Sequence, residues 1–205
     1  MAKIILDFGS GNTCKNKKVI IERMYNELKM IDNKKHEIIV KWQLFKRSGS
    51  NVPLTEESFD YAYNYGKSLG YDVTSSVFDK ESLIFLLNYD IPFVKLANRR
   101  DTDFLINYMP QKMPVYISKT HDLFLPKMER KIVEMWCISR YPAKKHDYEK
   151  LDIKQGDAIS DHTEDFSLFN KYKPEVVEWH YKLDFSTGLD AGSFSRTPEQ
   201  LKEIL

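Results

Sequence analysis

Eight short apolar runs recur along this chain of 205 residues, and segments with helical spacing or turn-forming residues separate most of them. The runs lie at residues 3–8, 37–45, 71–78, 91–97, 114–118, 132–139, 157–162 and 175–181. Their length and composition indicate strands. Helices are expected between most of them, for example at 19–30, 55–67, 80–87, 101–108 and 164–172, and a last helix begins at Thr197-Pro198.

Strands that alternate with helices form a parallel sheet, and eight such units predict an α/β fold, a compact (β/α)8 TIM barrel of one domain over residues 1–205. The segments after the fifth and sixth strands predict shortened helices. An open doubly wound sheet is the alternative. Such a sheet usually carries a glycine-rich phosphate loop after its first strand, and Gly9-Ser10-Gly11-Asn12 matches that loop poorly.

Charge, hydropathy and cysteine content bear on the partners and the cellular compartment of this chain. Lys and Arg number 31 and Asp and Glu 30, so the net charge of +1 gives no reason to expect nucleic acid or an anionic membrane as a partner. No apolar run approaches the roughly 20 residues of a membrane span. Cys14 and Cys137 lack metal-ligand spacing, and free thiols favour a cytoplasmic protein.

Polar side chains stand near the carboxyl end of almost every predicted strand. They are Asp7, Lys41, Gln43, Ser76, Lys95, Ser118, Ser139, Tyr141, Ser160, His162, Glu178 and His180. The active site of a barrel of this type lies at the carboxyl ends of its strands. We therefore expect these residues to meet in one site.

Lys41 and Lys95 lie inside apolar strands, in phase with other polar ends. A buried lysine without a partner costs several kcal/mol. A single lysine of this kind is more often at a strand edge with its amine in solvent. Two together favour a bound anion, a phosphate or carboxylate. The serines at 76, 118, 139 and 160 are candidates to complete the anion site.

The last two strands end in Ser160-Asp161-His162 and Glu178-Trp179-His180. Alternate residues share a face of a strand, so the two histidines and Glu178 converge if these strands are neighbours. Such a set suits a divalent metal with open coordination positions. A structural role for each histidine is the alternative. An anion beside a metal suits chemistry in which the metal polarises a carbonyl next to a phosphorylated reactant.

The ordered motifs resemble those of the sialic acid synthase (N-acetylneuraminate synthase) family. They are Val40-Lys41-Trp42-Gln43, Ser75-Ser76-Val77-Phe78-Asp79, Val94-Lys95-Leu96-Ala97, Ile117-Ser118, Ser139-Arg140-Tyr141-Pro142, Ser160-Asp161-His162-Thr163, Glu178-Trp179-His180, and Gly188-Leu189-Asp190 before Ser193-Phe194-Ser195. Together they cover essentially the whole chain in the family's order, and the series as a whole is more specific than any single motif.

The resemblance implies a metal-assisted condensation of phosphoenolpyruvate with the aldehyde of an N-acetylated amino sugar, such as N-acetylmannosamine, to give a nonulosonic acid and phosphate. It implies that Lys41, Lys95, Ser76, Ser118, Ser139 and Ser160 hold phosphoenolpyruvate, that His162 and His180 bind Mn²⁺ or Mg²⁺, and that Gln43, Tyr141 and Asp190 contact the sugar. Asp7 replaces a family glutamate near the metal-site water or sugar, and Glu178 belongs to the substrate-binding set. The expected catalytic residues are Asp7, Lys41, Lys95, His162 and His180.

The chain departs from the family pattern at several positions. Where the family has a serine and an acid after the fourth strand, this chain has Asn98 and Arg100, and Arg99 with Arg100 predicts a positive mouth that suits a more acidic acceptor. The family's antifreeze-like C-terminal domain, which supplies an arginine to the sugar across a dimer, is expected to be absent. The resemblance therefore implies a homodimer or a separate partner chain.

Two other functions remain open from the residues alone. One is a non-catalytic phosphoenolpyruvate- or anion-binding barrel derived from this family. The other is an unrelated metal-dependent aldolase barrel, a Schiff-base version of which would use Lys41 or Lys95 as its nucleophile.

Overall fold

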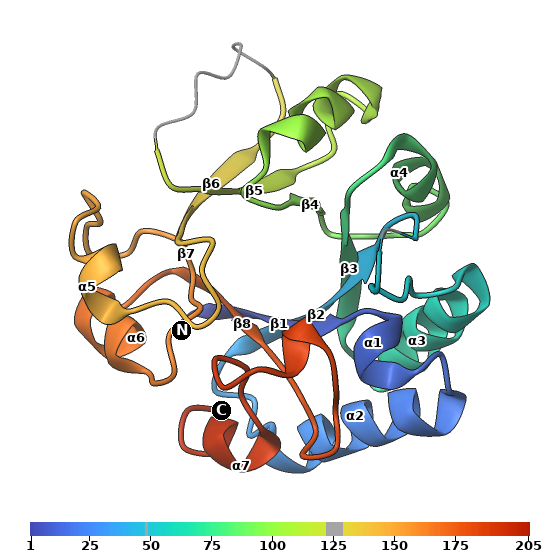
Figure 1. Cartoon of the computed structure of the whole chain (residues 1–205), viewed down its shortest axis with the longest axis horizontal. Helices are drawn as coiled ribbons and strands as arrows, with labels where there is room; N and C mark the ends of the chain where they lie inside the picture. Colours follow the sequence, from blue (N-terminus) through green and yellow to red (C-terminus); the bar gives the residue numbers. More distant parts are fainter. Residues whose placement is uncertain (48, 122–128) are drawn as a thin grey trace.

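The computed structural model describes residues 1–47, 49–121 and 129–205. Its centre is a closed barrel of eight parallel strands in sequence order, with β1 paired to β8 (Figure 1). The strands are β1 (Lys3–Gly9), β2 (Glu37–Leu44), β3 (Asp72–Val77), β4 (Val94–Leu96), β5 (Val115–Lys119), β6 (Ile132–Cys137), β7 (Ile159–Ser160) and β8 (Val176–His180). The predicted (β/α)8 barrel is confirmed, and the open doubly wound sheet is wrong.

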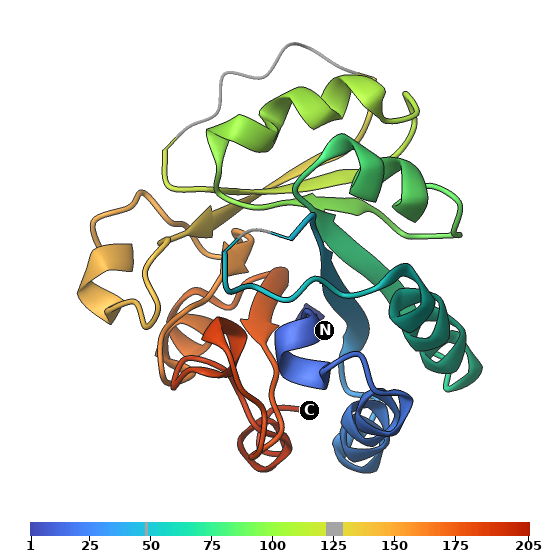
Figure 2. The ribbon, with the colours of Figure 1, turned by 45° about the vertical axis from the view of Figure 1, so that its right-hand side comes forward.

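Helices of unequal length surround the barrel. They are α1 (Gly11–Cys14), α2 (Lys18–Ile31), α3 (Glu56–Ser68), α4 (Lys80–Leu86), α5 (Lys145–Tyr148), α6 (Ser167–Tyr172) and α7 (Pro198–Leu201), with 3-10 helices η1 (Arg100–Tyr108) and η2 (Leu189–Ala191). The long helices α2 and α3 lie outside β1 to β3 (Figure 2). In the ranges that the structure describes, no helix is both long and apolar enough to cross a membrane.

The prediction of shortened helices after the fifth and sixth strands applies to two segments. Residues 143–156 contain only the four-residue α5, in a stretch whose polar composition indicates no helix. The described residues between β5 and β6 contain no helix, and residues 122–128 lie outside the described part of the chain. The sequence also missed α1 and η2, each a single turn too short to show a repeating apolar pattern.

Two strands are shorter than their apolar runs predict. The run at 91–97 contributes only Val94–Leu96, and the run at 157–162 contributes only Ile159–Ser160. Pro92 has no N–H for a ladder bond, so the earlier run cannot pair from its start. The apolar pattern follows burial, which continues before β4 at Phe93 and after β7 at Asp161 and His162, beyond the residues that pair.

Local signals set the helix starts. The side chain of Asp79 accepts a hydrogen bond from Ser82 N at 2.8 Å and begins α4. Thr197 and Gln200 form a reciprocal capping box, and Pro198 occupies the first turn of α7. The capping side chains of Asp79 and Thr197 therefore define where α4 and α7 begin.

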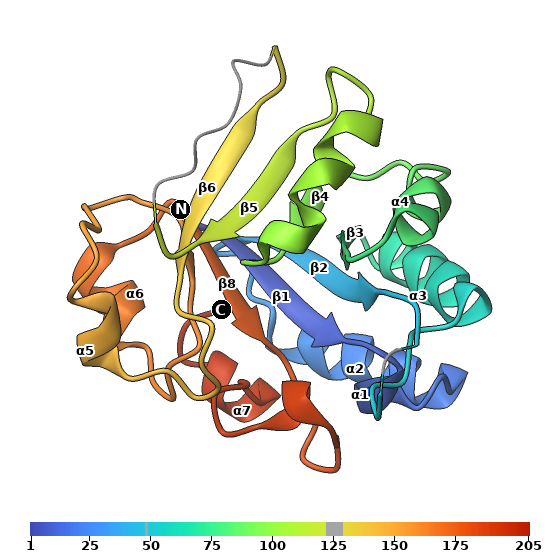
Figure 3. The same ribbon diagram turned by 45° about the horizontal axis from the view of Figure 1, so that its top comes forward.

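The barrel interior changes from apolar to polar along the strands. Ile5, Ile39, Phe93, Tyr116 and Met135 form a buried cluster inside the barrel, with the Phe93 and Tyr116 rings stacked at 3.9 Å. Inward-facing residues recur every two positions, so the next layer toward the carboxyl ends holds polar side chains. The arrows of β1, β2 and β8 run side by side toward this end (Figure 3). The apolar layer thus forms a closed base beneath the polar layer.

Gly66 marks a close approach of α3 to its neighbours. A Cβ built there would lie 2.7 Å from both Tyr25 Oη and Val73 Cγ2, and Tyr25 is held by a hydrogen bond from Trp42 Nε1 at 3.2 Å. Gly66→Ala should lower the free energy of unfolding by about 1–3 kcal/mol through overpacking. Urea unfolding followed by circular dichroism measures it.

The usual effect of replacing a helical glycine with alanine is a gain of stability. A gain in Gly66→Ala would contradict this packing argument. Asn64→Ala, at an exposed position of the same helix, is the control and should stay within about 0.5 kcal/mol of the wild type.

Candidate active site

A cavity of about 510 Å³ opens at the carboxyl end of the barrel. It is lined by every residue that the sequence placed in the site: Asp7, Lys41, Gln43, Ser76, Lys95, Ser118, Ser139, Tyr141, Ser160, His162, Glu178, His180 and Asp190. Its size is typical of small-molecule sites. The structure therefore brings the predicted residues together, while their roles remain proposals.

Lys41 is enclosed by acceptors on the floor of the cavity. Its Nζ lies 2.6 Å from Asp7 Oδ2, donates to Ser76 Oγ at 2.8 Å and lies 3.7 Å from Glu178 Oε2. Burial lowers the pKa of Lys41, but Asp7 and Glu178 outweigh burial and hold the pKa above its usual value. Lys41 is thus a fixed cation that ties β1, β2, β3 and β8 together.

Lys95 is less well compensated. Its Nζ donates to Ser118 Oγ at 2.7 Å and to Leu96 O at 3.2 Å, and its nearest carboxylate oxygen, Glu178 Oε1, is 3.7 Å away. Burial lowers the pKa of Lys95, and Glu178 only partly opposes the effect. An anion bound beside Lys95 would therefore stabilise its charged form.

Glu178 stands between the two lysines. Ser160 donates to Glu178 Oε1 at 3.0 Å, while Oε2 is buried and forms no hydrogen bond within the described structure. Despite burial, the two lysines hold the pKa of Glu178 below its usual value. The floor therefore carries two lysines and two carboxylates. Among the described residues, Glu178 Oε2 lacks a hydrogen-bond donor, and Lys95 lacks a carboxylate within hydrogen-bond distance.

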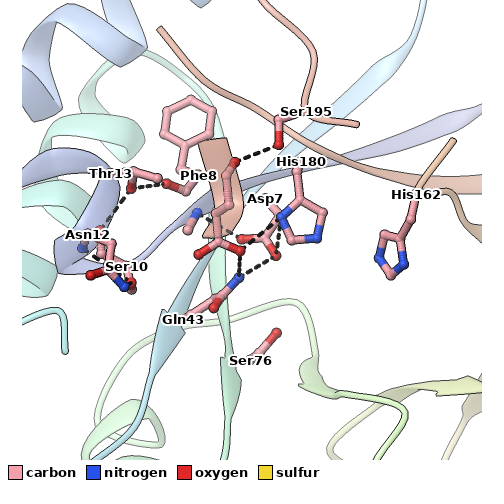
Figure 4. A network of polar contacts seen from close by, with 12 residues as sticks. Asp7, Phe8, Ser10, Asn12, Thr13, Gln43, Ser76, His162, His180 and Ser195 are labelled. Carbon is pink, nitrogen blue, oxygen red and sulfur yellow. Dashed lines mark hydrogen bonds and ion pairs between the residues drawn. The ribbon is translucent and has the colours of Figure 1, made fainter. Parts of the chain in front are cut away.

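The two histidines lie side by side at the ends of β7 and β8. Their ring centroids are 5.3 Å apart. Figure 4 shows His180 close to Asp7 and Gln43, whereas His162 has no contact drawn to the other residues of the network. His162 Nδ1 is 2.8 Å from the carbonyl oxygen of Ile138, so this nitrogen carries the proton. His180 Nδ1 is 3.1 Å from Asp190 Oδ1.

The two imidazoles differ in charge. Burial, together with His180 nearby, lowers the pKa of His162 to about 3, so that its ring is neutral. Burial also acts on His180, but Asp7 and Asp190 outweigh it and raise the pKa of that ring. A neutral imidazole thus stands beside one that readily takes a proton.

The two histidines are the candidate metal ligands in this cavity. Each ring has its Nδ1 beside an oxygen atom, which leaves the Nε2 atoms as the remaining metal-binding nitrogens. Among the described residues, no group of three or more His, Cys, Asp or Glu is placed to hold a metal. A metal held by two imidazoles would keep its other positions for water and substrate. Mg²⁺, which favours oxygen ligands, fits this donor set less well than a transition metal.

The rim combines polar and aromatic groups. The Tyr141 ring lies 4.4 Å from the His162 ring, and Phe194 packs against His180 at 5.0 Å. Asn98 donates to Ser139 Oγ at 2.9 Å. The rim is thus held by contacts between loops that follow different strands.

The predicted positive mouth is only partly present. Arg99 lines the cavity, but its guanidinium makes a two-fold contact with Asp101, at 3.0 and 2.5 Å, which offsets its charge. Arg100 begins η1 and is not among the residues that line the cavity. Of the two arginines, only Arg99 therefore lines the cavity.

Sequence reasoning missed Cys137 as a cavity residue. It is buried, lines the cavity and has its Sγ 4.0 Å from His162 Nδ1. Burial raises its pKa to about 11, so the thiol is not a nucleophile in this state. The available signal was its phase, because Cys137 lies two residues before Ser139 on the same face of the strand. Other lining residues outside the prediction are Phe45, Lys46, Asn51, Phe78, Asp79, Ala97 and Leu189.

A family model for the NeuB family matches residues 13–205. The chain belongs to the NeuB family. No curated protein matches the sequence. This membership confirms the resemblance that the ordered motifs indicated.

Solved structures share the fold of this NeuB-family chain. N-acetylneuraminic acid synthetase from Leptospira borgpetersenii serovar Hardjo-bovis, in complex with citrate, matches with a TM-score of 0.75 at 18% identity, over 98% of this chain and 80% of that one. Spore coat polysaccharide biosynthesis protein spsE from Bacillus subtilis matches with a TM-score of 0.73 at 16% identity, over 98% and 65%.

A third match is phospho-2-dehydro-3-deoxyheptonate aldolase (DAHP synthase) from Thermotoga maritima, with a TM-score of 0.66 at 12% identity, over 98% of this chain and 66% of that one. The chain thus spans about four fifths of the Leptospira protein and about two thirds of the other two. At these identities the similarity shows the barrel fold alone.

The low pKa of His162 predicts loss of stability in acid. The unfolded chain binds a proton at this histidine below about pH 6.5, whereas the native ring stays neutral until about pH 3. Its contribution is present above pH 6.5 and is lost as the pH falls toward 3. In metal-free protein, His162→Asn should reduce the loss of unfolding free energy between pH 6.5 and 4, as measured by urea titrations at each pH.

His146→Asn is the matched control, because it removes an exposed histidine whose Nε2 lies 3.2 Å from Asp147 at the surface. Its effect on the acid limb should be smaller than that of His162→Asn. An acid limb of equal slope in wild type and His162→Asn would show that His162 is not held neutral in the native state.

Proposed function

We propose that this NeuB-family barrel condenses phosphoenolpyruvate with the open-chain aldehyde of an N-acetylated amino sugar, giving a nonulosonic acid and phosphate. In this reaction carbon 3 of phosphoenolpyruvate bonds to the aldehyde carbon, water adds to carbon 2, and inorganic phosphate leaves as the aldehyde oxygen gains a proton. Family membership and the arrangement of the cavity floor support the proposal.

The observation that carries the proposal is the pair of buried lysines that share Glu178. Lys95 has its nearest carboxylate oxygen 3.7 Å away, and Glu178 approaches Lys41 at the same distance. A phosphate or carboxylate bound beside Lys95 would give this lysine a closer anionic partner than Glu178. The hydroxyl groups at positions 76 and 118, which accept from Lys41 and Lys95, lie within the same floor and would donate to its oxygens, whereas the Ser160 hydroxyl already donates to Glu178.

The acceptor sugar would occupy the side of the cavity next to the histidines. Tyr141 supplies an aromatic surface there, and Gln43 supplies an amide already oriented by Asp7 and Asp190 at 2.9 and 3.0 Å. A divalent metal bound by His162 and His180 would act as a Lewis acid on the aldehyde. Asp7, whose pKa is lowered by Lys41 and His180 against the effect of burial, would stay ionised and hold Lys41 in place.

Lys95→Met should weaken phosphoenolpyruvate binding by at least about thirty-fold, because it removes a buried cation that faces the bound anion. Isothermal titration calorimetry without sugar measures the dissociation constant. Lys202→Met, at an exposed position of the C-terminal segment, is the charge-matched control and should bind like the wild type. Unchanged affinity in Lys95→Met would remove Lys95 from the anion site.

Phosphate release tests the reaction itself. With Mn²⁺ and phosphoenolpyruvate, a panel of N-acetylated hexosamines and simple aldoses should include one sugar that triggers release, and His162→Ala should abolish this release. Retained activity in His162→Ala would remove the proposed metal role. Phosphoenolpyruvate binding without release on any sugar would favour a non-catalytic barrel, and borohydride trapping of a keto acid on a lysine would favour a Schiff-base aldolase.

A further inference from the structure

The loop after β8 folds back over the end of its own strand. Arg196 N donates to His180 O at 2.7 Å, and Lys182 N donates to Arg196 O at 3.0 Å. Lys182 Nζ also donates to the carbonyl oxygens of Ala191 and Gly192 at 3.2 and 2.9 Å. Residues 182–196 therefore form a loop whose two ends are joined beside His180.

This loop places Asp190 against the imidazole. Asp190 belongs to η2 and is 7% exposed. Gly188, at φ +90°, begins η2 where a Cβ would lie 2.7 Å from Asn12 Cβ, so the turn requires glycine both for its backbone angle and for space. Ser195 Oγ donates to Asp190 O at 2.5 Å. The backbone at Asp190 is thus fixed by contacts on both sides.

Asp190 Oδ1 has two partners inside the protein. It lies 3.1 Å from His180 Nδ1 and accepts from Gln43 Nε2 at 3.0 Å. Asp7 is farther from the ring, with Oδ2 at 3.7 Å from Nδ1, and this oxygen already contacts Lys41 at 2.6 Å. Asp190 is therefore the carboxylate nearest to His180 Nδ1, and the contact is an ion pair at 3.1 Å in which Nδ1 forms no hydrogen bond to the described residues in this conformation.

We propose that Asp190 is a positioning residue for His180, which keeps the proton on Nδ1 and directs Nε2 toward a divalent metal. The proposal rests on the metal site of the proposed function. At His162 the corresponding oxygen is the carbonyl of Ile138, which is hydrogen-bonded to Nδ1 at 2.8 Å, whereas at His180 the carboxylate of Asp190 forms an ion pair with Nδ1 at 3.1 Å. A histidine ligand whose other nitrogen donates to a carboxylate is oriented and more basic. The Oδ1 atom that contacts His180 and Gln43 is thereby committed within the protein.

The test compares Mn²⁺ affinities of substrate-free protein, measured by electron paramagnetic resonance of free Mn²⁺. Asp190→Asn should bind Mn²⁺ about 10–100-fold more weakly than the wild type. Asp184→Asn removes one negative charge from an exposed position of the same loop and should bind Mn²⁺ like the wild type. This control separates a contact with His180 from a change in overall charge.

The outcomes distinguish the two proposals. Equal Mn²⁺ affinity in Asp190→Asn and wild type, with a raised KM for the sugar, would overturn the positioning role and make Asp190 a sugar contact. Equal loss of affinity in Asp184→Asn would overturn it as well, because the effect would then come from charge alone. A wild type that binds no Mn²⁺ would overturn the metal site itself.

A second readout needs no metal. Long-range ¹H–¹⁵N spectra of protein labelled at histidine, recorded in alkaline solution where the ring is neutral, report which nitrogen carries the proton. His180 should show a single Nδ1-protonated form in the wild type and a mixture of both forms in Asp190→Ala. The same single form in both proteins would overturn the proposal whatever the metal result.

Discussion

The sharing of two carboxylates by two buried lysines is the interaction on which the site depends. Lys41 and Lys95 are each 2% exposed, and Glu178 approaches both at 3.7 Å. Each buried ion carries a desolvation cost of several kcal/mol, so loss of any one member leaves an uncompensated charge. Because the members come from β1, β2, β4 and β8, their balance also fixes how these strand ends meet. The polar layer is thus a structural element as well as a binding surface.

The two lysines of this layer differ in how closely a carboxylate pairs with them, and so do the two histidines. Lys41 has Asp7 at 2.6 Å, whereas Lys95 has hydroxyl and carbonyl partners and a more distant carboxylate. The same contrast separates His180, which has two carboxylates near it, from the neutral His162. Of the two lysines, Lys41 has a close carboxylate partner within the protein, and Lys95 is left for a bound anion. Of the two histidines, His180 has carboxylates beside its Nδ1 and His162 has a carbonyl oxygen, so the Nε2 atom of each would be left for a metal.

The period of the strands explains what the sequence could reveal. Residues two apart share a face, so the amino-acid pattern alone assigns Lys41 with Gln43 and Ser160 with His162 to one site. Cys137 lies on the same face of its strand as Ser139, but its side chain is not strongly polar, so the pattern of polar strand ends did not include it. Asp190 and Gln43 are 147 residues apart, and their contact depends on a folded loop. No local sequence pattern predicts this contact. Likewise, apolar runs located β4 and β7 but not their lengths, because pairing depends on neighbouring strands.

The site does not require long helices on every side of the barrel. β6 packs its outer face with side chains: Lys119 Nζ lies 4.2 Å from the Trp136 ring and 2.5 Å from Glu134 Oε2, and Trp136 Nε1 donates to Asp157 at 3.1 Å. Site residues nevertheless extend from the ends of β5 to β7, at positions such as Ser118 and Ser160. Strand register places them, and the closed apolar base beneath them holds the register. The helices can therefore shorten on this side while the cavity floor keeps its geometry, because the floor is built from the sheet.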